Sequence, residues 1–385
     1  MAYHLPRGFN NDDWQSPEWE HLPPSPDNGD NSHEFDGYFN NRNVEWDEPL
    51  IVNDEMRNNG VKSGKGLVRK GMDLCNRVVS NMHSPLILNQ EAKRNYELEI
   101  GVSHVRKGKD LEKKGDLEGS LSEFQMGAKI LTKHLGEDDI ETAGTYHIIG
   151  VLLVRKGELN ESLTELYKGL RVFERELGEH HETGLIYNDI GNILVLLDSL
   201  EQALTELKRS MEIFKKVLRW NHVDIADTHN SIGSVLQKLG NIDGAMVEHR
   251  EALHIFLKVF GKYHPKTAIT RNRLGLALFC NGDSAHAMKA FSKVLEIKVK
   301  LLGEEHRLTA SSYTSMGLVL ESLGYPTSAL KVYKKAYHVQ EKHFGHQHPD
   351  TINTKELINN ISEERSGNKL QVIGKELMLR TSTSL

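Results

Sequence analysis

The sequence contains little cysteine: Cys75 and Cys280 are the only two among 385 residues. Two cysteines so far apart form neither the close pair of a zinc site nor the framework of a disulfide-stabilised domain, so we expect a reducing, intracellular compartment. Long apolar runs are also lacking, because the longest, such as residues 148–154, fall far short of the ~20 residues that span a bilayer. Residues 1–13 have no apolar signal core. These features predict a cytoplasmic protein without a membrane partner.

The motifs of the common enzyme classes are absent as well. The chain has no GxSxG, HExxH, paired CxxC or dinucleotide-binding fingerprint. Residues 60–66, GVKSGKG, imitate a phosphate loop, but one residue is missing between the glycines and Gly66 stands where the Ser or Thr for magnesium belongs. No run of Lys and Arg compares with a nucleic-acid-binding patch. We therefore expect a non-enzymatic protein with no cofactor and no nucleic-acid partner.

Glycine, in contrast, is abundant and regularly spaced. Three series of residues keep one register through six units of about forty-two residues, and a period of this length indicates a solenoid. The first series is Gly108, Gly150, Gly191, Gly233, Gly275 and Gly317. The second is Gly115, Gly157, Asp198, Gly240, Gly282 and Gly324, and the third is Ser120, Ser162, Ala203, Ala245, Ala287 and Ala329.

Each unit is predicted to form two helices, called helix A and helix B. Leu274 and Leu278 fall on one stripe of a helix A, and equivalent apolar pairs recur in the other units. The second glycine of each unit ends helix A, because a residue without Cβ takes the left-handed conformation easily. A glycine inside helix A costs about 1 kcal/mol relative to alanine. Its recurrence therefore indicates close approach of a neighbouring helix.

The junctions between units carry a series of histidines: His180, His222, His264, His306 and His348. The first unit has Asp139 at the same place, which suggests that this position caps the following helix. Histidines can also bind zinc, but successive members of the series lie a whole unit apart. We therefore expect no metal site.

These features together resemble the tetratricopeptide repeat, over residues from about 95 to 358. The helix A glycine, the turn glycine and the small residue near the start of helix B are signature positions of that family. The forty-two-residue unit with its junction FGKYHPKT (residues 260–267) is similar to the kinesin light chain subclass. The resemblance implies an all-α fold, a right-handed α-solenoid of helix pairs. Trp220 and Asp198 replace a junction glycine and a turn glycine, and local irregularity is expected there.

The expected domains are an acidic disordered segment, a capping helix with its linker, six repeats, and a second capping helix with a flexible tail. Their bounds are residues 1–60, 61–92, 93–348 and 349–385. Within them, an amphipathic helix is expected in residues 66–83 and the closing helix in residues 349–366, because terminal repeats need caps.

A peptide-binding groove is predicted from the repeat register. The residues three positions before the helix A glycine point away from the packing stripe. In tetratricopeptide repeats this position lines the concave face, where an asparagine amide can hold a peptide backbone. The alternative is that these are solvated polar residues near helix ends. The predicted groove residues are His147, Arg155, Asn188, Asn192, Asn230, Gln237, Lys238, Arg271, Asn272, Arg273 and Thr314.

The first sixty residues are acidic, with thirteen Asp or Glu against three Lys or Arg, and contain three of the four tryptophans. Within them, Val44, Glu45, Trp46, Asp47 and Glu48 resemble the tryptophan-acidic peptides that kinesin light chains bind. Three alternatives remain open for this motif. It docks into the groove of its own chain, it docks into another copy or partner, or it has no docking role.

The favoured function is an adaptor or scaffold that binds a peptide segment of a partner protein. One candidate for that peptide is an acidic motif that contains tryptophan. The resemblance implies cargo recognition for a microtubule motor and association with the cytoskeleton. However, kinesin light chains grip the kinesin heavy chain through a long heptad coiled coil, and residues 1–60 contain none, which puts that partner in doubt. The alternative function is a regulatory subunit or sensor that holds an enzyme or transcription factor inactive.

Overall fold

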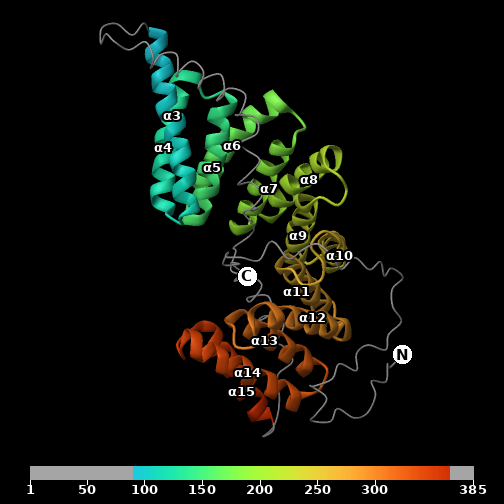
Figure 1. The fold of residues 1–385 in the computed structure, drawn as a ribbon. Coiled ribbons are helices and arrows are strands. Elements are labelled where there is room, and N and C mark those ends of the chain that lie inside the picture. The colour runs from blue at the N-terminus through green and yellow to red at the C-terminus, as the bar shows by residue number, and fades with distance from the viewer. Residues whose placement is uncertain (1–89, 365–385) are drawn as a thin grey trace, which may run out of the picture. The chain divides into compact units, whose positions relative to one another are not determined.

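The structure, a computed structural model, describes residues 90–364, and this part of the chain consists of thirteen helices without a strand (Figure 1). The acidic segment, the predicted helix at 66–83 and the motif at 44–48 lie outside the described residues. The helices are α3 (Gln90–Lys113), α4 (Leu117–Leu135), α5 (Ile140–Lys156), α6 (Leu159–Leu177), α7 (His181–Leu196), α8 (Leu200–Val217), α9 (Val223–Lys238), α10 (Ile242–Phe260), α11 (Pro265–Cys280), α12 (Ser284–Leu302), α13 (Arg307–Ser322), α14 (Pro326–Phe344) and α15 (Pro349–Glu364). None of these helices is long and apolar enough to cross a membrane.

Consecutive helices pair, and consecutive pairs stack. Helices α3, α5, α7, α9, α11 and α13 are the helices A of six repeats, and each packs against the helix B that follows it. Each helix B also packs against the next helix A, and α14 packs against α15. Figure 1 shows this succession from α3 to α15. The predicted fold class, an all-α solenoid of helix pairs, is confirmed.

The helix A glycines are points of close approach, as predicted. A Cβ on Gly150 would lie 2.7 Å from Cγ of Leu166 on the paired helix, and one on Gly233 would lie 2.7 Å from the ring of His249. Both distances are shorter than real Cβ contacts allow. The glycines therefore let helices A and B pack more closely than any other residue would permit.

The residues at the junctions between repeats cap the helices that follow them, as the sequence analysis predicts. Oδ1 of Asp139 accepts the backbone N–H of Glu141 at 2.9 Å at the start of α5. The five junction histidines do the same with Nδ1, each accepting the backbone N–H two residues later at 3.2 to 3.4 Å. Each satisfies a backbone donor that the first turn leaves without a partner.

The two substituted glycine positions behave differently. Asp198 keeps the left-handed conformation of the turn glycines, with φ of 57°, and the expected irregularity at this turn is wrong. The junction before α9 is irregular, because α8 is followed by extended Leu218 where the other junctions have a glycine with positive φ. Trp220 lies exposed in this junction and stacks on His254 of α10, with 5.9 Å between ring centroids.

At one register position of the helices B, the buried residue is apolar in four repeats and polar in the last two. Successive helices place Leu131, Phe173, Phe214, Phe256, Lys298 and Gln340 at equivalent buried positions. The ammonium group of Lys298 donates to the backbone oxygen of Leu308 at 2.8 Å and to Oγ of Ser311 at 3.2 Å. Burial lowers the pKa of Lys298 to about 8.

Candidate functional site: a polar ladder and a basic pocket

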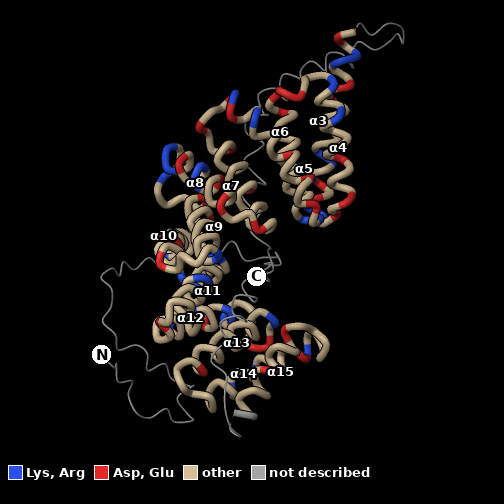
Figure 2. Tube along the Cα trace, turned by 180° about the vertical axis from the view of Figure 1, so that it is seen from behind, with Lys and Arg blue, Asp and Glu red and all other residues tan. Residues whose placement is uncertain are grey.

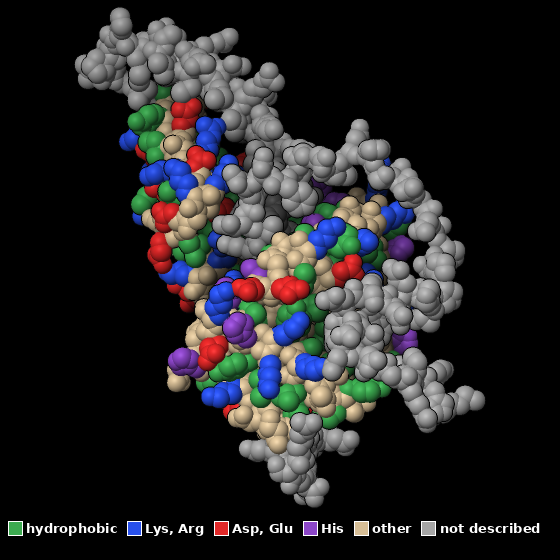
Figure 3. Space-filling model, turned by 60° about the horizontal axis from the view of Figure 1, so that its bottom comes forward, with side chains coloured by type: hydrophobic (Ala, Val, Ile, Leu, Met, Phe, Trp, Pro, Cys, Tyr) green, Lys and Arg blue, Asp and Glu red, His purple; other side chains and the backbone are tan. Residues whose placement is uncertain are grey.

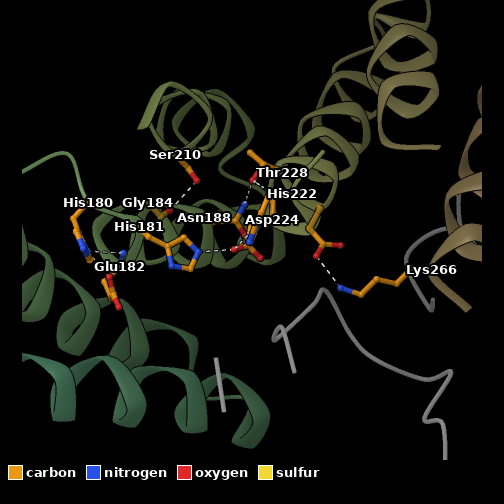
Figure 4. A network of polar contacts seen from close by, with 11 residues as sticks. His180, His181, Glu182, Gly184, Asn188, Ser210, His222, Asp224, Thr228 and Lys266 are labelled. Atoms are coloured by element: carbon orange, nitrogen blue, oxygen red, sulfur yellow. Dashed lines mark hydrogen bonds and ion pairs between the residues drawn. The ribbon is translucent and has the colours of Figure 1, made fainter. Parts of the chain in front are cut away.

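Polar side chains connect the helices A of successive repeats. We call these contacts the polar ladder, and Figure 4 shows its middle part around α7 and α9. Its rungs are His147 with Asp189, His181 with Asp224, Asn188 with Thr228, Asp227 with Lys266, Asn230 with Thr270, and Ser234 with Arg273. Each rung joins residues 39 to 43 positions apart in the sequence, because the solenoid places equivalent turns of consecutive helices A side by side.

Two of the predicted groove asparagines, Asn188 and Asn230, lie within this ladder and are buried. Nδ2 of Asn188 donates to Oγ1 of Thr228 at 2.8 Å, and Nδ2 of Asn230 donates to Oγ1 of Thr270 at 2.6 Å. Oδ1 of Asn230 also accepts a hydrogen bond from Nδ1 of His249 at 3.1 Å. These amides hold repeats together, and a peptide backbone would have to replace those bonds. Peptide binding by these residues stays a prediction.

Three other predicted groove residues on helices A also make bonds inside the solenoid. Nε2 of His147 lies 2.8 Å from Oδ2 of buried Asp189, and burial raises the pKa of that carboxyl against the effect of His147. Asn192 donates to Oδ1 of Asn188 at 2.9 Å, and Thr314 donates to its own helix. Each of these three side chains is therefore already bonded to another residue of the solenoid.

The remaining predicted groove residues do not share one surface. Arg155, Gln237 and Lys238 lie in the last turns of α5 and α9, where Arg155 is 3.5 Å from Glu112. Arg273 points to Ser234 of α9, and buried Asn272 lies beside it. Arg271, two residues earlier, instead points to a pocket between α10 and α12. The structure therefore separates residues that the repeat register grouped together.

We call this hollow the basic pocket. It has a volume of about 300 Å³ and is lined by residues of α10, α11 and α12 and of the turn before α12. Its lining comprises Arg250, Arg271, Leu274, Leu278, Asp283, His286, Lys289, Ala290 and Lys293. Four of these residues are Arg or Lys, against the single carboxylate of Asp283, which is paired with His286 at 2.8 Å. On the face shown in Figure 3, basic side chains likewise lie among hydrophobic ones.

Arg271 is the deepest basic group of this pocket. Its Nε is buried and has no hydrogen-bond partner among the described residues. Burial lowers the pKa of Arg271, and the charge of Glu296 opposes that effect. A buried guanidinium nitrogen without a partner carries a desolvation cost of about 1–3 kcal/mol. Leu274 and Leu278, both buried in the hydrophobic core, line the pocket beside it.

The structure also brings together a group that the sequence analysis missed. One ring nitrogen each of His181 and His222 and one carboxylate oxygen of Asp224 all lie within 4.8 Å of one another. The metal site was excluded because the junction histidines lie one unit apart. His181 is the residue after the series member His180, and stacking of α7 on α9 brings it to the next junction (Figure 4). The argument against a metal considered only members of the series and did not cover His181.

Comparison with known proteins assigns the family. The sequence matches the family described as "Tetratricopeptide repeat" over residues 141–216, 224–298 and 309–350, together about half of the chain. The chain is a tetratricopeptide repeat protein. Its fold and its six-unit register agree with this assignment, which makes it a member of a family of protein-interaction scaffolds. No curated protein sequence matches it at a significant level.

Several solved structures are similar to this chain at low sequence identity. The apo form of RapI is 20% identical, with 69% of this chain and 97% of RapI covered and a TM-score of 0.54. BtubC (BKLC) from P. vanneervenii is 15% identical, with coverage of 66% and 94% and a TM-score of 0.50. A candidate kinesin light chain from Podosopora anserina is 18% identical, with coverage of 52% and 95% and a TM-score of 0.47. At these identities the likeness shows the fold alone.

Proposed function

We propose that this tetratricopeptide repeat protein is a non-enzymatic adaptor that binds an acidic, aromatic-containing peptide, with the basic pocket between α10 and α12 as the anchoring site. The observation that carries this proposal is the lining of the pocket, in which four basic side chains lie beside two leucines with a single carboxylate. Acidic and basic residues are interspersed along the described helices, as Figure 2 shows. The lining of the pocket, in contrast, holds four basic residues and one carboxylate.

The lining of the pocket defines the ligand chemistry. A carboxylate of the peptide would pair with Arg271, and Arg250, Lys289 and Lys293 at the rim would attract further negative charge. An indole or aliphatic side chain would cover Leu274 and Leu278, which adds apolar contact at the centre of the site. The volume of about 300 Å³ is at the lower end for a small ligand site and suits one anchoring side chain.

The chain itself contains a peptide of this chemistry in residues 44–48. We include in the proposal that this motif occupies the pocket and thereby inhibits binding of a partner. Residues 1–60 carry thirteen acidic and three basic side chains, a charge opposite to that of the pocket. A tethered segment can reach an effective concentration of about 1 mM, so even a weak contact would mask the site.

In the alternative function, as a regulatory subunit, the same pocket would hold an acidic segment of the regulated protein.

The experiment measures binding of a dye-labelled peptide of residues 40–50 to the full chain by fluorescence anisotropy. Trp46→Ala removes the anchor of the internal motif, and we expect it to tighten binding of the added peptide about tenfold. Arg271→Gln in the Trp46→Ala background should weaken binding by 10-fold or more, because it removes the charged partner of the carboxylate. Raising the salt concentration should weaken both contacts.

Two further variants distinguish the pocket from the helix A face. Arg209→Gln changes a cation of α8 outside the pocket and should leave binding unchanged. Arg273→Gln changes a cation that points to α9. If Arg273→Gln abolishes binding while Arg271→Gln has no effect, the groove predicted along the helix A face is the binding site and the pocket is not. Absence of binding in all backgrounds contradicts the proposed function.

A further inference from the structure

A group of two imidazoles and one carboxylate lies at the junction between the third and fourth repeats, away from the basic pocket. His181 is the first residue of α7, His222 caps α9, and Asp224 is the second residue of α9. We propose that His181, His222 and Asp224 bind one divalent transition-metal cation, with zinc as the natural choice, and that this ion clamps α7 to α9.

The geometry around Asp224 supports this site. Oδ2 of Asp224 lies 2.6 Å from Nε2 of His181 and 3.4 Å from Nδ1 of His222. The two imidazole rings meet edge to face, with centroids 5.7 Å apart and an interplanar angle of 73°. Around a tetrahedral zinc ion with bonds of about 2.0–2.2 Å, ligand atoms lie roughly 3.4 Å apart. The candidate atoms, all within 4.8 Å of one another, reach that spacing by small side-chain rotations.

The donor set has the chemistry that such an ion prefers. Imidazole nitrogens and a carboxylate oxygen are ligands of zinc, and three protein ligands leave a fourth position for water or another group. The side chain of Asp224 is only 2% exposed, whereas those of His181 and His222 are 18% and 32% exposed. The site is therefore closed on the carboxylate side and accessible on the histidine side, which gives the ion a route of entry.

Electrostatics also favour a cation here. Asp189, Asp224 and Asp227 are buried along the same ladder, and Lys266 pairs with Asp227 at 2.8 Å. Glu182 adds a carboxylate beside His180, and His147 faces Asp189. The negative charge of Asp224 contributes to the raised pKa of Asp189, after burial. A divalent ion would neutralise buried negative charge that imidazoles neutralise only when protonated.

Neighbouring hydrogen bonds hold the carboxylate-bearing turn in place. The backbone oxygen of Asp224 accepts from Thr228 at 2.7 Å. The bond from the backbone N–H of Asp224 to Nδ1 of His222, at 3.2 Å, would be given up if that nitrogen bound the ion. Thr228 in turn accepts from Asn188 of α7 at 2.8 Å, as Figure 4 shows. Such supporting contacts fix the direction of ligands around metal sites.

The other junctions lack this combination, which provides internal controls. The residue equivalent to His181 is Val223, Pro265, Arg307 or Pro349 in the repeats that follow. The junction before α9 is also the one in which extended Leu218 replaces the capping glycine. The metal would therefore tie together two helices A at the place where the connection between repeats departs from the regular form.

The test is calorimetric titration of the full chain with zinc chloride. We expect one tight site per chain in the wild type. His181→Ala and Asp224→Asn should each weaken that site 10-fold or more, and neither residue supplies the capping atom of α9. His264→Ala, which alters the equivalent cap of α11 outside the group, should leave the tight site unchanged. Substituted cobalt should give the visible absorption of a tetrahedral ion in the wild type and not in His181→Ala.

A thermal melt keeps the test independent of folding defects. Zinc should raise the melting temperature of the wild type and of His264→Ala, and should not raise that of His181→Ala, whose circular dichroism should remain helical. Equal zinc affinity in the wild type and His181→Ala would overturn the proposal. So would the absence of a tight site in the wild type, which would leave the group as an ion pair between repeats.

Discussion

The buried ammonium group of Lys298 leads to a prediction about stability. Lys298 occupies a core position where α8 and α10 place Phe214 and Phe256, and no carboxylate pairs with it in the described structure. We expect Lys298→Met to stabilise the protein at pH 7. Methionine has a similar length and fills irregular core space without a charge.

The magnitude follows from the pKa of Lys298, which burial lowers from 10.5 to about 8. A difference of this size corresponds to roughly 3 kcal/mol against the charged form in the folded state. The variant loses hydrogen bonds to Leu308 and Ser311, but Ser311 also donates to the Leu308 oxygen at 2.9 Å, so no buried group loses its only partner. Subtracting about 1 kcal/mol for the lost bonds leaves a gain of roughly 2 kcal/mol.

The pH dependence gives the sharper test. Between about pH 8 and 10.5 the unfolded chain keeps the proton on Lys298 while the folded chain releases it, so wild-type stability rises with pH. The penalty is present in full below pH 8 and is lost by pH 10.5. The advantage of Lys298→Met should therefore shrink by roughly 3 kcal/mol across this window.

The assay is urea denaturation followed by circular dichroism at pH 7, 9 and 10.5. Lys334→Met, at an exposed position of α14, is the matched control and should change stability by less than about 0.5 kcal/mol at each pH. If Lys298→Met destabilises the protein equally at every pH, the bonds of the ammonium group outweigh the cost of its burial, and the reasoning is refuted.

Two further predictions concern histidine and glycine. Burial, with a smaller contribution from nearby Arg273, lowers the pKa of His249 to about 3, so the folded state resists its protonation and wild-type stability falls as pH drops from 6.5 towards 3. His249→Leu should cost about 1–2 kcal/mol at pH 7, because Asn230 loses a donor, and urea melts at pH 4.5 should show a smaller difference or a reversal. Gly150→Ala should destabilise by about 1–3 kcal/mol through its clash with Leu166. Gly144→Ala, in the same helix with nothing within 4 Å, should stabilise by up to about 1 kcal/mol in the same melts, and equal effects of the two alanines would contradict the close-packing argument.

The repeat pattern predicted the solenoid well, because each of its signals depends on local geometry. A glycine in the left-handed conformation, a side chain that caps a helix and a glycine under a neighbouring helix act within one or two adjacent elements. The turn at Asp198 was misjudged for a related reason. Aspartate can also adopt positive φ, so the substitution changes the residue and leaves the turn intact.

The site was predicted less well, because it depends on contacts between repeats. The register predicted that Asn188 and Asn230 point away from the packing stripe within a repeat, yet Oδ1 of Asn230 accepts a hydrogen bond from His249 on the paired helix B. It could not show that the next helix A would cover them and bond to their amides. Arg271 and Arg273 lie two residues apart and therefore point to opposite neighbours. A comparison of residues 39 to 43 positions apart would have identified the pair His181 and Asp224.

The histidine caps place an imidazole acceptor at the start of four successive helices A and of the closing helix. A cap accepts its hydrogen bond through a lone pair of Nδ1, and an imidazole that has gained a second proton has no lone pair to offer. Burial lowers the pKa of His264 to about 4 and also lowers that of His306, so these two junctions keep their acceptors in mildly acidic solution. Each of the last five repeat junctions begins its next helix with such an atom. Protonation of such an imidazole would therefore leave the first turn of the next helix without its side-chain acceptor, and this weak point recurs at regular intervals along the chain.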